Sequence, residues 1–327
     1  MTALLVAEDL TIDYITPRGT VRALDGATLT LEPGTSLGLV GESGSGKTTL
    51  GMAIGRLLPS YARRVGGDLS IDGRSVFALD NDGITTLRRD RLGFVFQSPM
   101  AALDPTMRIG RQVSFSLGDR ARGDDVFTLL RKVGLADVEH VARAYPHELS
   151  GGMAQRVVIG MAIARRPSLI VADEPTASLD ASIRDQILDL LMALKEEAGA
   201  AFILLSHEMS VVARYCDMIA VMYGGRVVEH GPSADVLNQP THPYTRALLE
   251  AAPGKERAGQ RLSPIPGVPP VLSGPSTGCS FAPRCRWAED LCHRTRPMAR
   301  DVAGRITVCH RAEAVAEACD DNAFAEN

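Results

Sequence analysis

GESGSGKT, residues 41–48, stands between an apolar run, SLGLV (36–40), and an apolar segment with helical spacing, TTLGMAIGRLL (48–58). The stretch has the form G-x-x-x-x-G-K-[ST] between a strand and a helix, which is the context in which this motif cradles phosphates. Gly41, Gly44 and Gly46 allow the backbone to turn its N–H groups toward phosphate oxygens. The start of the helix adds positive potential. The sequence therefore predicts an α/β P-loop NTPase.

The side chains of this loop have separate expected roles. Lys47 reaches the β- and γ-phosphates of a nucleotide, and the Thr48 hydroxyl is a ligand for Mg²⁺. A glycine-rich turn with a merely solvated lysine is the alternative, and the flanking strand and helix disfavour it. We expect ATP to contact the whole stretch, which comprises Gly41, Glu42, Ser43, Gly44, Ser45, Gly46, Lys47, Thr48 and Thr49.

A second candidate group of polar residues ends another apolar run, SLIVADEP (168–175). A P-loop requires a carboxylate on the Mg²⁺ side at the end of a neighbouring strand, and Asp173 has that position. Glu174 follows directly and could act as the general base for the attacking water. The alternative is that the two acids simply end a strand. The presence of a P-loop in the same chain disfavours this alternative.

Strand-like and helical segments alternate after residue 167. SLIVAD (168–173) is followed by an expected helix (182–198), a strand (201–206), a helix (209–216) and a strand (218–225). This alternation favours a parallel α/β sheet. Residues 98–166 have a mostly helical character instead.

The segment 148–180, ELSGGMAQRVVIGMAIARRPSLIVADEPTASLD, resembles the nucleotide-binding subunits of ATP-binding cassette (ABC) transporters. The resemblance implies a RecA-like core with an antiparallel β subdomain and a helical subdomain. It also implies that Ser150, Gly151 and Gly152 close over the γ-phosphate bound by an opposite subunit, so that two subunits dimerise. A plain glycine-rich helix cap is the alternative. Met153 departs from the glutamine usual in this signature, and methionine recurs there in peptide importers.

Four further positions match the family in the expected order. Tyr14 matches the aromatic residue that stacks on adenine, although a half-buried strand tyrosine would look the same. Gln97 matches the glutamine that senses Mg²⁺ and water and faces the membrane partner. Ser178, Leu179 and Asp180 match the loop at the dimer seam. His207 matches the histidine that contacts the γ-phosphate.

Five of the six cysteines lie in the last fifty residues, and Cys216 is expected to be a small buried residue of the core. Cys279, Cys285, Cys292 and Cys309 have the spacing C-x₅-C-x₆-C-x₁₆-C, without the close pairs typical of structural zinc. Together with THPYTRALLEAAP (241–253), the stretch resembles the C-terminal extension of oligopeptide/dipeptide importers. In related importers these four cysteines can hold a [4Fe–4S] cluster, and four thiolates is the right ligand count. Zinc and free thiols remain alternatives, and Cys319 lies outside the pattern.

The resemblance implies a nucleotide-binding domain at residues 1–238, with the helical subdomain inserted at about 98–166, and an irregular cysteine-rich extension at 239–327. It implies an ATPase at the cytoplasmic face of the inner membrane, as a peripheral subunit. The expected partners are a second ATPase subunit, two permease subunits and, indirectly, a solute-binding protein. The second ATPase is expected to be a paralogue in a heterodimer, with a homodimer as the alternative. The expected cargo is peptides; nickel chelates or oligosaccharides, or a soluble ABC ATPase without a transport role, are the alternatives.

Composition supports this interpretation. The formal net charge of -4 over 327 residues gives no electrostatic reason to expect nucleic acid. The N-terminus lacks the basic region of a signal peptide, and no run approaches the roughly 18 apolar residues of a membrane span.

Overall fold

The computed structural model describes residues 3–118, 122–177, 179–251 and 264–324. The chain divides into two units, the first comprising Met1–Ala78 with Leu205–Asn327 and the second Leu79–Leu204. Unit 1 contains the P-loop, His207 and the cysteine-rich extension. Unit 2 contains Gln97, Asp173 and the signature segment around Ser150.

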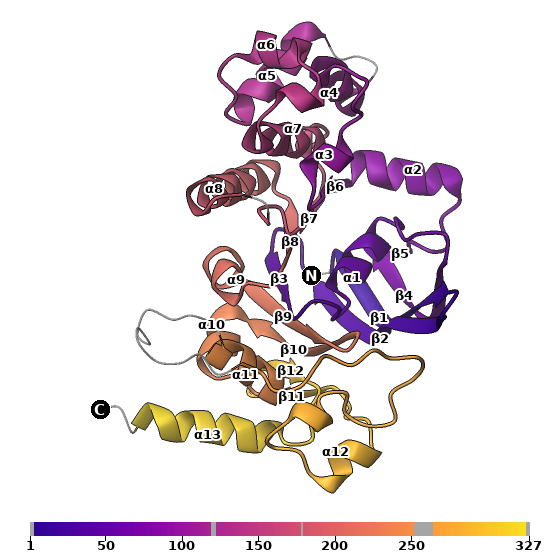
Figure 1. Ribbon diagram of the computed structural model, residues 1–327, viewed down its shortest axis with the longest axis vertical. Coiled ribbons are helices and arrows are strands. Elements are labelled where there is room, and N and C mark those ends of the chain that lie inside the picture. Colours follow the sequence, from indigo (N-terminus) through magenta and orange to yellow (C-terminus); the bar gives the residue numbers. More distant parts are fainter. Residues whose placement is uncertain (1–2, 119–121, 178, 252–263, 325–327) are drawn as a thin grey trace. The chain divides into compact units, whose positions relative to one another are not determined.

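An antiparallel sheet forms the N-terminal part of unit 1, with the strand order β2-β1-β4-β5 (Figure 1). In β1, Leu5 and Ala7 are buried, and after them Leu10 and Ile12. The change from odd to even positions follows a bulge in the register between Ala7 and Leu10, because one extra residue reverses the face of every later side chain. The strands are β1 (Leu5–Thr16), β2 (Gly19–Leu31), β4 (Ala62–Ile71) and β5 (Arg74–Ser75).

A second sheet of unit 1 carries the P-loop. Its strands run in the order β3-β9-β10-β12-β11, with β3 parallel to β9 and the later neighbours antiparallel. All five residues of β3 are buried, as the continuous apolar run predicted. The strands are β3 (Ser36–Val40), β9 (Met218–Tyr223), β10 (Arg226–Pro232), β11 (Arg300–Val302) and β12 (Arg305–Thr307). The helices beside them are α1 (Lys47–Ile54), α9 (Met209–Tyr215), α10 (Ser233–Asn238) and α11 (Pro243–Ala251).

The C-terminal extension is more regular than the sequence analysis expected. The hairpin β11–β12 adds two strands to the second sheet, next to β10. These strands are three residues long, too short for an alternating pattern to stand out in the sequence. The 3₁₀ turn η3 (Ala282–Arg284) and the helix α12 (Asp290–Arg294) precede the hairpin. The helix α13 (Ala312–Phe324) follows it.

One buried carboxylate joins β10 to the start of the extension. Glu229 is fully buried and accepts bonds from the backbone N–H of Thr241 (2.8 Å), the Thr241 hydroxyl (2.8 Å) and the N–H of His242 (3.0 Å). A buried carboxylate with this many donors is well satisfied. It fixes the chain immediately before α11.

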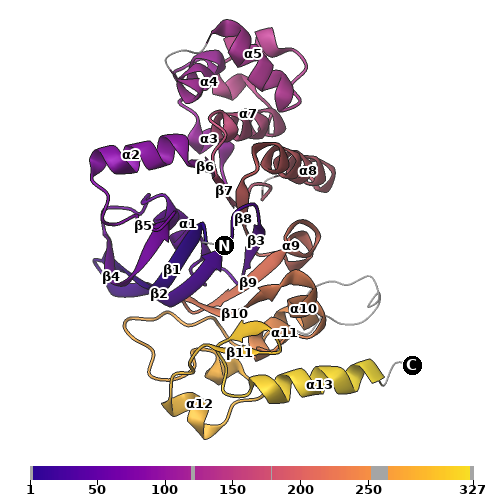
Figure 2. The same cartoon turned by 180° about the vertical axis from the view of Figure 1, so that it is seen from behind.

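Unit 2 combines a short parallel sheet with a group of helices (Figures 1 and 2). β6 (Leu92–Val95) pairs in parallel with β7 (Leu169–Asp173), and β8 (Ala201–Ser206) lies next to β7. The helices are α2 (Asn81–Asp90), α3 (Pro99–Ala102), α4 (Ile109–Leu117), α5 (Gly123–Lys132), α6 (Val138–Arg143), η1 (Pro146–Glu148), α7 (Gly151–Ile163) and α8 (Ala181–Ala198).

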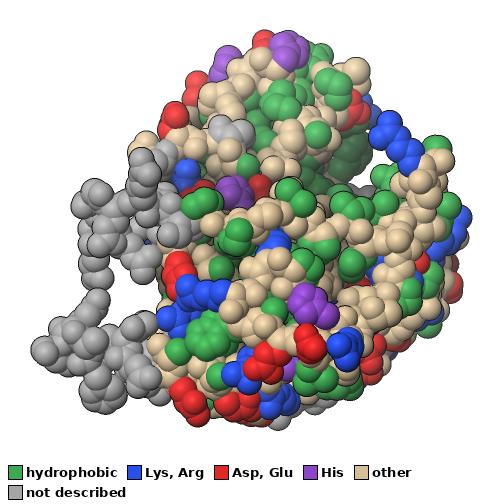
Figure 3. Space-filling view, turned by 60° about the horizontal axis from the view of Figure 1, so that its bottom comes forward, with side chains coloured by type: hydrophobic (Ala, Val, Ile, Leu, Met, Phe, Trp, Pro, Cys, Tyr) green, Lys and Arg blue, Asp and Glu red, His purple; other side chains and the backbone are tan. Residues whose placement is uncertain are grey.

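Surface charges are mixed rather than gathered by sign. On the face turned forward in Figure 3, Lys and Arg side chains lie beside Asp and Glu side chains. In the extension, for example, Arg311 pairs with Glu289 at 2.7 Å. Among the helices that the structure describes, none combines the length and apolar character needed to cross a membrane.

A half-buried histidine on β10 makes stability depend on pH. Burial lowers the pKa of His230 to about 4, from about 6.5 in an unfolded chain. The unfolded state therefore takes up a proton below pH 6.5 while the folded state resists it, so stability present above pH 6.5 is lost as pH falls toward 4. Between pH 7.5 and 5 the free energy of unfolding should fall by up to about 2 kcal/mol through this residue. Urea unfolding of His230→Gln should show a correspondingly flatter pH profile.

The exposed His140 provides the matched control, because His140→Gln removes a histidine without removing a buried one. An unchanged pH profile in His230→Gln would contradict this prediction.

Candidate functional site

Two glycines allow the P-loop its path between β3 and α1. Gly46 caps α1 in the left-handed conformation, with φ of 107°. A Cβ at Gly46 would lie 2.7 Å from the Ala23 carbonyl oxygen, and one at Gly41 would lie 2.2 Å from the Met222 carbonyl oxygen. Any other residue at these positions would have to displace backbone. The loop conformation therefore requires glycine.

The Lys47 side chain is only 7% exposed. Its Nζ donates to the carbonyl oxygens of Gly41 (2.7 Å) and Glu42 (3.1 Å), so the loop curls around the ammonium group. Ser43, Gly44 and Thr48 are exposed. The loop thus presents small residues and a hydroxyl to solvent over a positively charged base, an arrangement suited to a phosphate group.

Two residues that the sequence analysis did not identify hold Glu42. The Glu42 N–H donates to the Tyr244 hydroxyl at 2.8 Å, and the Glu42 carboxylate receives two bonds from Arg284. Both partners belong to stretches quoted for the family resemblance, THPYT and APRC, but nothing in their local pattern indicates the P-loop.

The other predicted nucleotide residues of unit 1 are Tyr14 and His207. The Tyr14 hydroxyl, on β1, is 2.9 Å from the Thr49 hydroxyl of α1, and the Tyr14 ring lies 5.5 Å from that of Tyr61. His207 directly follows β8 and its side chain is 56% exposed. Tyr14 is thus connected to the helix that the P-loop starts, and the roles of both residues toward ATP stay predictions.

In unit 2, the structure brings Gln97 and Glu174 together. Asp173 is the last residue of β7 and is buried, and Glu174 follows it with a φ of 43°. Gln97 Nε2 donates to Glu174 Oε2 at 3.2 Å. A positive φ is costly for glutamate, and residues held in such conformations gather at functional sites. The bond from Gln97 helps to orient this carboxylate.

The signature segment starts a helix as expected. Ser150 caps α7 and its hydroxyl accepts a bond from the Met153 N–H at 3.3 Å. Gly151, the first residue of α7, is exposed, and a Cβ built on it would meet Leu179 in ordinary van der Waals contact at 3.9 Å. These observations agree both with a phosphate contact and with a plain cap. Asp180 caps α8 and is exposed; Ser178 lies outside the described residues.

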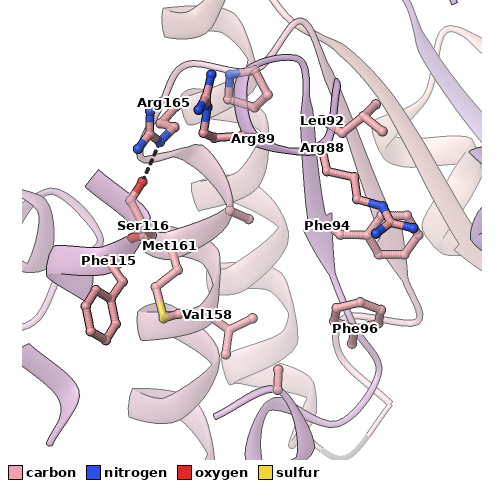
Figure 4. Close-up of a pocket in the computed structure, with 13 residues that line it drawn as sticks. Arg88, Arg89, Leu92, Phe94, Phe96, Phe115, Ser116, Val158, Met161 and Arg165 are labelled. Carbon is pink, nitrogen blue, oxygen red and sulfur yellow. Dashed lines mark hydrogen bonds between the residues drawn. The ribbon is translucent and has the colours of Figure 1, made fainter. Parts of the chain in front are cut away.

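A pocket of about 370 Å³ lies within unit 2 (Figure 4). Figure 4 shows Phe115 and Met161 projecting from two helices on one side, with Phe94 of β6 and Phe96, just after that strand, on the other. Arg88, Arg89 and Arg165 also line the pocket, and Arg165 Nε donates to the Ser116 carbonyl oxygen at 3.0 Å. The pocket is therefore apolar with a basic border.

The four clustered cysteines converge within unit 1. Cys279, Cys285, Cys292 and Cys309 all line one small cavity of about 10 Å³, together with Trp287. This volume corresponds to about one water-sized sphere. Cys216 is buried elsewhere in the core, as predicted. Cys319 belongs to α13, and its side chain is outside the described part.

Burial makes Cys279, Cys285 and Cys309 weaker acids. It raises the pKa of Cys279, that of Cys285 to about 11 and that of Cys309 to about 12, and the neighbouring cysteines add to each rise. Opposing this, the Cys285 sulfur accepts the Trp287 N–H and the Cys309 sulfur accepts the Arg311 N–H, each at 3.3 Å. Backbone donors of this kind also stabilise metal-bound thiolates.

The side chains as they stand do not form a metal site. Throughout the described ranges, no group of three or more His, Cys, Asp or Glu residues is placed so that it could hold a metal ion. The expectation of an iron–sulfur site from the sequence therefore lacks support from the side-chain positions.

Comparison with known proteins decides the family. A family model described as "ABC transporter" matches residues 24–177, and one described as "Oligopeptide/dipeptide transporter, C-terminal region" matches residues 228–292. The "Oligopeptide transport ATP-binding protein OppD" of Salmonella typhimurium is 39% identical over 314 residues, which is 94% of this chain and 93% of that protein. The chain belongs to the ATP-binding subunits of oligopeptide-family ABC transporters.

Another relative of this ABC subunit is the "Probable peptide ABC transporter ATP-binding protein y4tR" of Sinorhizobium fredii, which is 40% identical over 95% of this chain and 96% of its own length. Among solved structures, a dimeric, post-hydrolysis state of the ATP-binding cassette MJ0796 bound to ADP and Pi is 30% identical, with a TM-score of 0.62. The matched region covers 70% of this chain and 98% of the MJ0796 chain. The likeness confirms the ABC cassette fold, and the family makes the subunit an ATPase.

Glu174 provides the first test of the site. Glu174→Gln keeps the bond to Gln97 possible but removes the carboxylate that we expect to act as the base, so kcat for ATP hydrolysis should fall about 10²- to 10³-fold. The affinity for ATP should change less than about threefold, because the P-loop is untouched. Phosphate release and equilibrium ATP binding measure the two quantities.

Glu197→Gln is the control, because Glu197 is an acid of the same unit that pairs with Lys132 at 2.7 Å on the surface. If the Glu174→Gln variant hydrolyses ATP at more than a tenth of the wild-type rate, Glu174 is not the general base.

Proposed function

We propose that this subunit hydrolyses ATP to power the import of peptides through a membrane ABC transporter. The observation that carries the proposal is the combination, in one chain, of a P-loop folded around Lys47 and an oligopeptide-type C-terminal region. Relatives that are 39–40% identical over 94–95% of this chain are described as peptide or oligopeptide transport ATP-binding proteins. We assign residues 1–238 to the nucleotide-binding domain and 239–327 to the extension.

In the proposed reaction, Lys47 neutralises phosphate charge and the Thr48 hydroxyl, Gln97 and Asp173 serve the Mg²⁺ ion. Glu174 orients and deprotonates the attacking water, and His207 steadies the γ-phosphate. The remaining P-loop residues and Tyr14 bind the nucleotide. Ser150, Gly151, Gly152 and Asp180 act on the nucleotide of an opposing subunit.

The opposing subunit is a second ABC ATPase, and we propose a paralogue. ATP then closes the two subunits and hydrolysis reopens them. Support comes from the exposure of Gly151 at the start of α7 and from the similar cassette MJ0796, which was solved as a dimer. Met153 departs from the usual glutamine, which favours a heterodimer with a subunit whose signature differs from this one.

The membrane partners dock, in our proposal, at the pocket of unit 2 that Figure 4 shows. Its apolar walls suit a short helix with an apolar face. The border arginines are already partnered, with Arg89 and Arg165 both pairing with Asp90, so the proposal rests on the apolar walls. Phe115 is 62% exposed although it is a large apolar residue, as expected of a side chain that a partner covers. The subunit would then work at the cytoplasmic face of the inner membrane, bound to two permease subunits. A solute-binding protein would deliver the peptides to these permeases from the other side.

The test is uptake of labelled di- and oligopeptides by cells that depend on this chain. Wild type should restore uptake and Lys47→Ala should abolish it. Phe115→Glu should also abolish uptake and co-purification with the permeases, while the isolated chain keeps its ATPase activity.

Val65 gives the matched control, since it is another exposed apolar residue but lies on β4 in unit 1. Val65→Glu should transport normally. If uptake of a nickel chelate or an oligosaccharide is restored and uptake of peptides is not, the proposed peptide cargo is wrong. ATP hydrolysis without uptake of any of these compounds would point to a soluble ABC ATPase.

We also propose that Cys279, Cys285, Cys292 and Cys309 hold a [4Fe–4S] cluster. The donor set fits, because four thiol sulfurs line one cavity and two of them already accept backbone N–H bonds. The cavity of about 10 Å³ is small, so loading requires these side chains to turn outward. It also requires loss of the thiol protons, which the raised pKa values oppose. When bound, the cluster would cross-link four segments of the extension.

Iron and acid-labile sulfide after anaerobic purification test this assignment. About four of each per chain are expected in the wild type. Cys292→Ser should lose most of the iron, whereas Cys216→Ser, a change at a buried cysteine outside the cavity, should keep it. One zinc per chain without sulfide would replace the cluster by a zinc site, and neither metal would leave four thiols.

A further inference from the structure

Glu42 of the P-loop is held at two separate atoms by the C-terminal extension. Its backbone N–H donates to the Tyr244 hydroxyl of α11 at 2.8 Å. Its carboxylate receives Arg284 Nη1 at 2.7 Å and Nη2 at 3.0 Å, a bidentate pair. Such pairs are both strong and geometrically specific. The main chain and the side chain of Glu42 are therefore fixed from outside the loop.

Arg284 is itself held on several sides. Its side chain is 5% exposed, and Nε donates to the Pro266 carbonyl oxygen at 2.7 Å. Nη1 also lies 3.2 Å from the Tyr223 hydroxyl. Arg284 ends the turn η3, and the next residue is Cys285 of the four-cysteine cavity. The guanidinium group therefore has one position, set by the fold of the extension.

An aromatic cluster holds Tyr244 in the same way. The Tyr244 ring lies 4.5 Å from the Tyr223 ring and 5.3 Å from the Phe281 ring, and Tyr223 and Phe281 are 5.1 Å apart. Tyr223 ends β9, whereas Phe281 precedes η3. Three rings at these separations interdigitate and restrict rotation, so the hydroxyl that meets Glu42 is rigidly presented.

Charge gives this arrangement a consequence for ATP. Glu42 places a carboxylate in a loop that receives a polyanion, and an unpaired carboxylate there would repel the phosphates. Arg284 neutralises it with a fixed counter-charge. The Glu42 carbonyl oxygen also accepts a bond from Lys47 Nζ at 3.1 Å, so a shift of Glu42 would move the support of the lysine.

We propose that Arg284 is a positioning residue of the nucleotide site, which holds Glu42 so that the P-loop is preset for ATP. The extension is then part of the ATP site rather than an appendage to it. This inference rests on the proposed use of ATP by the P-loop and on no assumption about metal in the cysteine cavity.

The test measures the dissociation constant for MgATP in the full chain by calorimetry. Arg284→Ala should raise it about tenfold, because Glu42 is left unpaired beside the phosphates. Glu42→Gln alone should raise it less than about threefold. The double variant Glu42→Gln with Arg284→Ala should bind ATP better than Arg284→Ala, since the repelling charge is gone. Arg284→Lys should recover part of the loss.

Arg286→Ala is the matched control. Arg286 lies two positions further along and its side chain is 58% exposed, and it pairs with Glu250 at 2.8 Å instead of with the P-loop. Its dissociation constant should stay within about twofold of wild type. In Arg284→Ala, kcat at saturating ATP should also stay within about twofold, because a lost positioning contact acts on binding.

Thermal melts of all variants separate a local effect from unfolding. If Arg284→Ala does not fold, Arg284→Lys and the double variant carry the comparison. The inference is overturned if wild type binds ATP and Arg284→Ala binds equally well. A double variant that binds as weakly as Arg284→Ala would support the positioning role and assign the loss to the loop's position instead of to the charge of Glu42. A wild-type chain that binds no ATP would instead overturn the proposed function.

Discussion

A nearly buried ammonium group governs the loop between β3 and α1. Lys47 has little access to water, so the carbonyl oxygens of Gly41 and Glu42 must face it. That requirement curls the loop, and the left-handed Gly46 then leads it into the helix. Because Glu42 contributes one of the two oxygens, whatever holds Glu42 also acts on the lysine. The geometry of the phosphate site is thereby connected to residues more than two hundred positions away.

The extension reaches that site through the sheet. Glu229 on β10 fixes the chain before α11, and the hairpin β11–β12 continues the same sheet beside β10. Tyr244 and Arg284 are thus presented by segments that are attached to the strands carrying the P-loop. The cysteine cavity borders the same turn, η3, which ends at Arg284. In our proposal, the thiol-rich segment therefore helps to fix the position of Arg284.

Local patterns predicted the elements that carry the chemistry. The apolar runs at 36–40, 169–173 and 201–206 are buried strands, and the glycine pattern at 41–48 forms the expected turn before a helix. The short strands β11 and β12 could not be predicted, because three residues show no period and their pairing depends on β10. The contacts of Tyr244 and Arg284 with Glu42 could not be predicted either, because only tertiary packing decides which carboxylate an arginine contacts. The convergence of the four cysteines followed from the resemblance, but the narrow cavity between them did not.

The contact between Glu42 and Arg284 spans 242 positions of the chain. At roughly 5–20 residues per second, a ribosome needs on the order of 10–50 s to synthesise the residues between them. During that interval β3, the P-loop and α1 have already emerged, while the residue that secures the loop does not yet exist. If Arg284 holds the loop as we propose, the phosphate site is among the last parts of the subunit to mature, although its own sequence is among the first to be made.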